Sequence, residues 1–198
     1  MYDYDVVLGI TGVLFGFFGY APYFRDIFRG TTKPHPFTWL VWGLLDATVC
    51  FAQISKGESA GAWVLGFSAA ANFLIVILAL LWGERRIALI DWICLAGAFV
   101  SIALWQITRD PTLAVVLVTL TDALAFVPTY RKGYLRPDEE TVTEFGFAAA
   151  KFALGFLALT TLSVTTALYP GYLVVANTVF VAMVLVRRRQ LAAGAPVR

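Results

Sequence analysis

The sequence predicts an all-α integral membrane protein with seven transmembrane helices. Of its 198 residues, 60% are hydrophobic and only 14% are charged, whereas soluble domains carry about 25% charged residues. The mean hydropathy is +0.77, and the apolar residues form long blocks of the kind that span membranes, which need roughly 18 residues or more. Because a helix satisfies its own backbone hydrogen bonds in lipid, we expect each block to be helical.

Seven apolar blocks can be drawn, each separated from the next by charges or by glycine and proline. They cover residues 6–24, 37–55, 61–82, 88–107, 112–130, 141–162 and 168–186. We expect one transmembrane helix for each block. The N-terminal MYDYD is acidic, and no small-residue cleavage site follows it. The first block is therefore expected to remain as a helix rather than to act as a cleaved signal peptide.

The basic loop residues are distributed unevenly between the two ends of the predicted helices. One side has Lys56 and Arg109. The other side has twelve basic residues, Arg25, Arg29, Lys33, Arg85, Arg86, Arg131, Lys132, Arg136, Arg187, Arg188, Arg189 and Arg198. The positive-inside rule places the richer side in the cytoplasm. We therefore predict a multi-pass protein of the cell inner (plasma) membrane, with its N-terminus outside and its C-terminus cytoplasmic.

The two halves of the chain match each other at a nearly constant spacing. FGYAPYFRDIF at 18–28 matches AFVPTYRKGY at 125–134, with Pro22 opposite Pro128. These prolines are 106 residues apart, and after the next loop the offset becomes 105. Self-similarity at a fixed spacing is the signature of a repeated structural unit.

The later matches concern polar residues in the middle of apolar blocks. At the offset of 105, Asp46 lies opposite Lys151 and Asn72 lies opposite Asn177, and these are the only two asparagines in the chain. Because a repeat of three helices ends on the side opposite its start, one more helix must return the chain before a parallel second repeat begins. We predict a first three-helix repeat at 1–84, a linker helix at 85–110, a second three-helix repeat at 111–187 and a basic cytoplasmic tail at 188–198.

This 3+1+3 plan, with a proline in the first helix of each repeat followed by a basic loop, resembles the SWEET and PQ-loop superfamily. The resemblance covers nearly the whole chain in organisation. The proline-glutamine pair that names the PQ-loop reads Pro-Tyr at 22–23 and Pro-Thr at 128–129. In SWEET sugar transporters, an asparagine in the third helix of each repeat faces the central cavity, and Asn72 and Asn177 match those positions. The resemblance implies two parallel three-helix bundles joined by a linker helix.

The paired polar residues are the candidate substrate-binding residues. Asn72 and Asn177 offer donors and acceptors that suit a polar ligand, or they could join helices within the membrane. Asp46 and Lys151 could form a structural ion pair, bind a zwitterionic or anionic ligand, or make no contact. Trp42 and Phe51 flank Asp46 and are further candidates for lining a cavity.

Two other sets of residues have possible roles in transport. Asp122 is a third intramembrane charge and, with Asp46, a candidate for proton coupling, because a desolvated carboxyl group can exchange a proton near neutral pH. Alternatively, Asp122 pairs with Lys151 or bonds a nearby threonine hydroxyl. Pro22 and Pro128 are candidate hinges, or they simply mark helix ends.

The expected function is membrane transport of a small polar solute (a sugar, amino acid or vitamin-like molecule) by alternating access, with or without proton coupling. The alternative is a membrane receptor or scaffold that does not transport. The sequence contains no phosphate-binding loop, nucleophile elbow or metal-ligand cluster, so we expect no catalytic residues, no cofactor and no metal. The expected partners are the solute and the lipid bilayer, without nucleic acid, and a homo-oligomer is compatible with the sequence.

Overall fold

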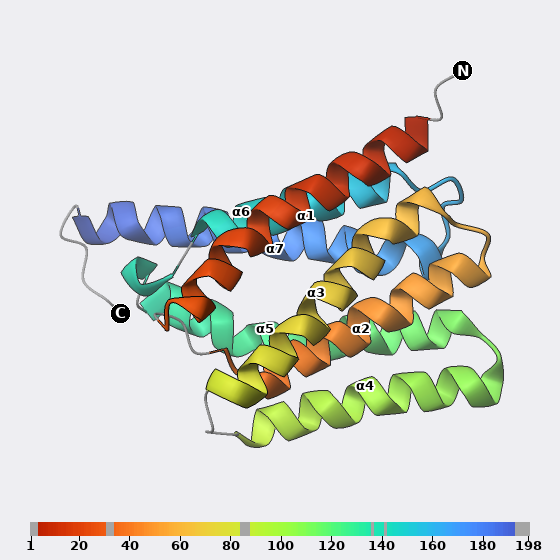
Figure 1. The fold of residues 1–198 in the computed structure, drawn as a ribbon, viewed down its shortest axis with the longest axis horizontal. Helices are drawn as coiled ribbons and strands as arrows, with labels where there is room; N and C mark the ends of the chain where they lie inside the picture. Colours follow the sequence, from red (N-terminus) through yellow and green to blue (C-terminus); the bar gives the residue numbers. More distant parts are fainter. Residues whose placement is uncertain (1–3, 31–33, 84–87, 136, 141, 193–198) are drawn as a thin grey trace.

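The computed structural model describes residues 4–30, 34–83, 88–135, 137–140 and 142–192, and it is a bundle of α-helices (Figure 1). The helices are α1 (Tyr4–Phe28), α2 (Pro36–Ser55), α3 (Ala60–Trp82), α4 (Leu89–Thr108), α5 (Pro111–Leu135), α6 (Val142–Leu157) and α7 (Val164–Ala192), with a short 3₁₀ turn, η1 (Pro137–Glu139), before α6. Each predicted block therefore corresponds to one helix. The all-helical fold class is confirmed for the described residues.

Within the described residues, six helices are long and apolar enough to cross a membrane, namely α1, α2, α3, α4, α5 and α7. This composition is typical of a multi-pass membrane protein. The exception is α6, which has 16 residues. At about 1.5 Å per residue it is roughly 24 Å long, compared with about 30 Å for the hydrocarbon core of a bilayer. The predicted sixth helix over 141–162 was therefore too long, because α6 ends at Leu157.

The boundary between α6 and α7 differs from the prediction because Ser163 caps α7. The Thr166 N–H donates to Ser163 Oγ at 3.2 Å, and the Ser163 N–H donates to Thr166 Oγ1 at 3.0 Å. This reciprocal pair satisfies two backbone donors at a helix start. As a result α7 begins at Val164, earlier than predicted. It also continues to Ala192, so residues 188–192 extend the helix instead of forming a separate tail.

A proline inside α7 is accommodated by a side chain from α2. Pro170 has no N–H to donate to the Thr166 carbonyl four residues earlier. Gln53 Nε2 donates to that carbonyl at 2.7 Å, and the Gln53 side chain is fully buried. The two halves of the chain are therefore joined at the position where the proline frees a backbone acceptor.

We expect Gln53→Leu to lower the free energy of unfolding by about 1–2 kcal/mol, because it leaves the Thr166 carbonyl without this donor. The expected loss is small because Gln53 Oε1 is itself buried without a partner among the described residues. Replacing the amide by an apolar side chain removes that unfavourable burial, which offsets part of the lost hydrogen bond. Denaturant unfolding in detergent would measure the loss. Pro170→Ala restores a backbone N–H, so it should reduce the cost of Gln53→Leu. An equal cost with and without Pro170→Ala would contradict this explanation.

The helices pack in two similar groups. In the first, α3 contacts both α1 and α2, and in the second, α7 contacts both α5 and α6. The groups meet where α1 packs against α6 and α2 packs against α5, while α4 lies against α5 and α2 (Figure 1). The main hydrophobic core, which includes Leu45, Leu65 and Val118, therefore forms between the groups as well as within them.

Most of the described basic residues lie at one end of the bundle. The ends of α1, α5 and α7 lie together on the left of Figure 1, and they carry Arg25, Arg29, Arg131, Arg187, Arg188 and Arg189. The loops with Lys56 and Arg109 lie at the opposite end. Lys33, Arg85, Arg86, Arg136 and Arg198, and the side chain of Lys132, lie outside the described residues. The uneven distribution predicted from the loops is thus present in the part of the bundle that the structure describes.

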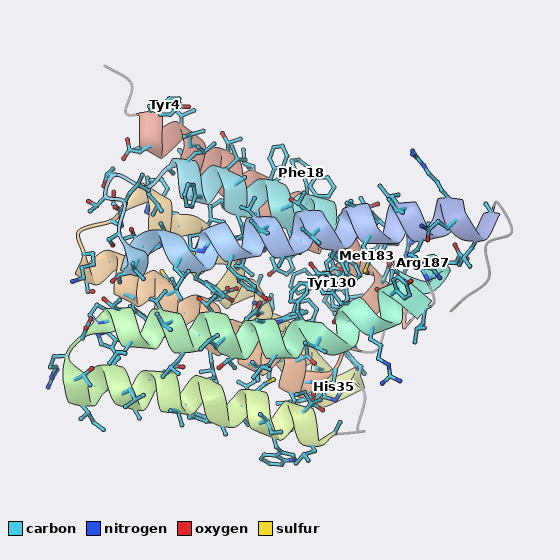
Figure 2. The ribbon with its side chains drawn as sticks, turned by 180° about the vertical axis from the view of Figure 1, so that it is seen from behind. Tyr4, Phe18, His35, Tyr130, Met183 and Arg187 are labelled. Atoms are coloured by element: carbon cyan, nitrogen blue, oxygen red, sulfur yellow. The ribbon has the colours of Figure 1, made fainter. Side chains whose placement is uncertain are left out.

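The arginines at the end of α7 hold the α5–α6 connection. Arg187, labelled near the end of α7 in Figure 2, is buried. Its guanidinium lies 4.2 Å from the centre of the Tyr134 ring at the end of α5. Arg188 donates to the carbonyls of Pro137 and Glu140. Both residues therefore have a structural role in addition to any effect on topology.

The two predicted hinge prolines lie inside helices rather than beyond their ends. Pro22 lies within α1, which continues to Phe28. Pro128 lies within the backbone range of α5, and its side chain lies outside the described residues. Both positions agree with the predicted blocks 6–24 and 112–130, and whether these prolines act as hinges or as ordinary punctuation near a helix end stays a prediction.

Candidate solute-binding site

Five of the buried polar or charged side chains, those of Asp46, Asn72, Asp122, Lys151 and Asn177, line one central cavity between the two helix groups. The cavity has a volume of about 90 Å³. Six of the residues singled out from the sequence line it, namely Trp42, Asp46, Asn72, Asp122, Lys151 and Asn177. They come from α2, α3, α5, α6 and α7. The structure thus brings together residues that are far apart in the sequence.

Phe51 does not belong to this cavity. Its side chain is 61% exposed on the outer side of α2 and lines a separate hollow beside Trp105. The reason is the helical period, because five residues correspond to a rotation of about 140° from Asp46, whereas the four residues to Trp42 nearly complete a turn. The prediction that Phe51 lines the site was wrong.

A chain of hydrogen bonds connects Lys151 to Asp46 across the cavity. Lys151 Nζ donates to the Tyr20 hydroxyl at 3.2 Å, and Tyr20 donates to Asn72 Oδ1 at 2.8 Å. Asn72 Nδ2 then donates to Asp46 Oδ2 at 3.1 Å. The other carboxylate oxygen of Asp46 accepts from the Tyr169 hydroxyl at 3.3 Å. Asp46 and Lys151 therefore interact through Tyr20 and Asn72.

The two charged residues do not form a direct ion pair in the described structure, so that alternative was wrong. Lys151 instead donates to Ser68 Oγ at 2.9 Å. Its ammonium also lies 4.4 Å from the centre of the Tyr20 ring and 4.6 Å from that of Phe152. The positive charge is thus surrounded by hydroxyl groups and aromatic faces, which stabilise an ammonium in a site with little water.

The two asparagines have different surroundings. Asn72 is part of the hydrogen-bond chain and is 2% exposed. Asn177 also lines the cavity, but its Nδ2 donates to the carbonyl of Leu173 in its own helix at 2.7 Å. The two amides therefore have different hydrogen-bond partners in this conformation, and their binding of one solute stays a prediction.

Asp122 is buried without a full set of partners. Its side chain is 1% exposed, and Oδ2 has no hydrogen-bond partner in the described part of the chain. Trp42 lines the same cavity, and the Tyr172 hydroxyl is likewise buried without a hydrogen-bond partner among the described residues. The alternative of a bond from Thr119 is wrong, because that hydroxyl donates to the Val115 carbonyl.

Sequence reasoning missed three residues that line the cavity, Tyr20, Glu144 and Tyr169, and it missed Ser68, which accepts a hydrogen bond from Lys151. Glu144 was detectable, because it lies seven residues before Lys151 and therefore on the same face of α6. Tyr20 was also detectable from its place two residues before the repeated proline. Ser68 and Tyr169 carried no such signal, since their positions depend on how α3 and α7 pack.

A further residue that sequence reasoning missed, Glu58, joins two loops at the end of the bundle near Lys56. Although it lies in the α2–α3 loop, Glu58 is 3% exposed. Its carboxylate accepts from the Thr160 N–H at 3.0 Å, from the Thr160 hydroxyl at 3.1 Å and from the Thr161 N–H. We call these three residues the Glu58 latch. The latch joins the α2–α3 loop to the α6–α7 loop.

Many residues around the cavity occur in pairs at the spacing of the sequence repeat. The pairs are Gly16 with Asp122, Tyr20 with Phe126, Trp39 with Glu144, Trp42 with Phe147, Asp46 with Lys151, and Asn72 with Asn177. The first two pairs have an offset of 106 residues and the others an offset of 105. Corresponding positions of the two halves thus contribute to one cavity with different chemistry.

Comparisons of the chain with protein family models, with curated proteins and with solved structures found no match. The chemistry of the cavity is therefore the basis for assigning a function.

Proposed function

We propose that the protein is a membrane transporter that moves a small polar solute by alternating access around the central cavity. The observation that carries this proposal is the set of charged and amide side chains buried between the two helix groups. Each charge at the middle of a membrane helix costs roughly 2.5–3.5 kcal/mol on insertion scales, and such residues are typical of solute and ion pathways. Asp46, Asp122 and Lys151 are three such residues around one cavity.

We also propose that the helix groups are two parallel repeats, arranged as in the SWEET and PQ-loop superfamily. Two observations support this. In each group the third helix packs between the first and second, and the contact of α1 with α6 has its counterpart in the contact of α5 with α2. The cavity is lined by repeat-related pairs, as expected when a pseudo-twofold axis passes through it.

The structure suits an inward-facing or occluded state of such a transporter. The Glu58 latch joins the two loops at the end near Lys56, and in this proposal it keeps that end closed. From the middle of the helices, the cavity extends to Trp39 and Glu144 in the first turns of α2 and α6, towards the arginine-rich end. If that end is cytoplasmic, as the positive-inside rule indicates, solute would leave or enter the cavity from the cytoplasm.

The size of the cavity limits what it can hold in this conformation. Its volume is about 90 Å³, while one water molecule takes up about 30 Å³ of the liquid and ligand pockets commonly measure about 300–1,000 Å³. It therefore accommodates a few waters or a solute of few atoms. A larger solute requires the helix groups to separate, which is the motion that alternating access provides.

Uptake into liposomes containing the purified protein, measured with a panel of labelled polar solutes, tests the proposal. We expect Asn72→Ala to reduce uptake about tenfold or more, because it breaks the link between Tyr20 and Asp46. Asn177→Ala is the matched control. It removes the same amide from the equivalent position but breaks only a bond within α7, so a smaller loss is expected.

The outcomes separate the two candidate functions. Solute binding without flux in any liposome assay would favour a receptor or scaffold that uses the same cavity. Uptake that is unaffected by both asparagine substitutions would place the transport pathway elsewhere. Asp122 and Asp46 remain the candidates for proton coupling, because both carboxyl groups face the cavity.

A further inference from the structure

The cavity contains more carboxyl groups than positive groups. Among its described lining residues, Asp46, Asp122 and Glu144 carry carboxyl groups and Lys151 carries the ammonium. Lys151 directs two of its bonds to neutral hydroxyls, those of Tyr20 and Ser68. An ammonium has three donors in total. Little of its hydrogen-bonding capacity is left for a solute carboxylate or phosphate, which would also be repelled by three carboxylates.

Asp122 is the group in the cavity that most needs a partner. It is 1% exposed, and its Oδ2 has no hydrogen-bond partner in the described part of the chain. A buried carboxylate without compensation costs several kcal/mol and is stabilised by a cation or by a proton. By contrast, Asp46 is already paired with Asn72 and Tyr169. Among the carboxyl groups of the cavity, the buried oxygen without a hydrogen-bond partner in the described residues is therefore Oδ2 of Asp122.

The surroundings of Asp122 suit an organic cation. Trp42 lines the same cavity as Asp122, and it packs edge-on against Trp39 with ring centres 5.3 Å apart. Phe126, one turn after Asp122, also lines the cavity. Aromatic faces next to a carboxylate are the usual site for ammonium groups. The same cavity already holds one ammonium in this way, because Lys151 lies over the rings of Tyr20 and Phe152.

We propose that the solute is a small organic cation, whose ammonium group binds between the Asp122 carboxylate and the Trp42 ring. This inference rests on the proposed transport function and specifies the class of its substrate. The apolar part of the solute would contact the aromatic residues of the lining. Asp46 and Lys151, joined through Tyr20 and Asn72, would form the opposite wall of the site.

Binding of matched pairs of compounds to the purified full-length protein tests the inference without any need for flux. Ethylammonium is compared with ethanol, and choline with 3,3-dimethylbutan-1-ol, so that shape is kept while charge is lost. Quenching of tryptophan fluorescence reports binding, because Trp39 and Trp42 line the cavity. We expect the cation of at least one pair to bind about tenfold or more tightly than its neutral partner.

Asp122→Asn should remove this preference, because it keeps the shape of the side chain and removes its charge. Asp138→Asn is the matched control, since the Asp138 side chain is 83% exposed in η1 and its loss should leave the preference unchanged. The inference is overturned if neither cation binds, if the neutral compounds bind equally well, or if the preference survives in Asp122→Asn. A thermal unfolding measurement shows whether Asp122→Asn is still folded, so that loss of binding through misfolding is recognised. Asp122→Glu is a second variant that keeps the charge, and in it the preference for the cation should return.

The results also distinguish this inference from the proposed function. Binding of ammonium compounds without uptake into liposomes would contradict transport and leave the cation site in place. Uptake of a neutral or anionic solute, with no binding of ammonium compounds, would leave transport in place and contradict the cation site. If Asp122 binds only a proton and no organic cation, no cation binding will be measured at any accessible pH, and the inference is then contradicted.

Discussion

Lys151→Met is expected to abolish solute uptake and to lower the free energy of unfolding by about 3 kcal/mol. Lys151 is 5% exposed and is the ammonium that faces the cavity among the described residues. Its removal leaves Asp46, Asp122 and Glu144 without the neighbouring positive charge. Breaking a buried charge pair by removing one partner costs about 3–5 kcal/mol. We take the lower end because Tyr20 and Asn72 separate the charges. Unfolding in detergent and uptake into liposomes measure the two effects.

The cost should depend on Asp46. Combining Lys151→Met with Asp46→Asn removes both charges, so the double variant should be less destabilised than the sum of the two single variants. Uptake should stay lost, because the polar wall of the site is no longer charged. Lys56→Met is the matched control, since Lys56 is exposed in the α2–α3 loop. Strict additivity of the two single effects would show that Tyr20 and Asn72 do not couple the charges.

The location of the site could be predicted because it depends on periodicity. The repeat offset brought Asp46 and Lys151 to equivalent positions, and buried charges in membrane helices turn inward to avoid lipid. Helical phase then determines which neighbours share the cavity, so Trp42 was correctly included. Phe51 was included because it is near Asp46 in sequence, although its helical phase places it on the outer face. That error could have been avoided from the sequence.

The contacts within the site could not be predicted in the same way. Whether Asp46 meets Lys151 directly depends on where Tyr20 and Asn72 direct their side chains, and this is decided by the packing of α1 against α3. The different surroundings of Asn72 and Asn177 arise for the same reason, since the residues at the equivalent positions next to them differ. Phe126, for example, has no hydroxyl where Tyr20 has one.

At the ends of the helices, too, some features could be predicted from the sequence and others could not. The cap of α7 could have been read from Ser163 and Thr166, which have the spacing of a reciprocal cap. The burial of Glu58 could not, because a charged residue in a glycine-containing loop is usually exposed. Its burial depends on the approach of the α6–α7 loop, which comes about 100 residues later in the chain.

Glu58→Ala is expected to open the cavity towards the end of the bundle near Lys56. The substitution removes the acceptor of three hydrogen bonds and leaves the backbone N–H groups of Thr160 and Thr161 without that partner. Hydrogen bonds to a charged group contribute about 1.5–3 kcal/mol each, although their effects are not additive. We expect a loss of about 3 kcal/mol in the free energy of unfolding. Since the latch joins the two halves, its loss should also favour the conformation that is open at this end.

Thiol labelling measures this opening. Leu173 lines the cavity and is 4% exposed, so a cysteine placed there reports access when Cys50 and Cys94 are replaced by serine or alanine. A membrane-impermeant reagent, added on the side of Lys56 in oriented liposomes, should label Leu173→Cys about tenfold faster when Glu58→Ala is present. Thr160→Val is the matched control. It removes the hydroxyl contact and keeps both backbone bonds, so its effect should be smaller. If Glu58→Ala lowers stability without changing the labelling rate, the latch only supports the fold and does not govern access to the cavity.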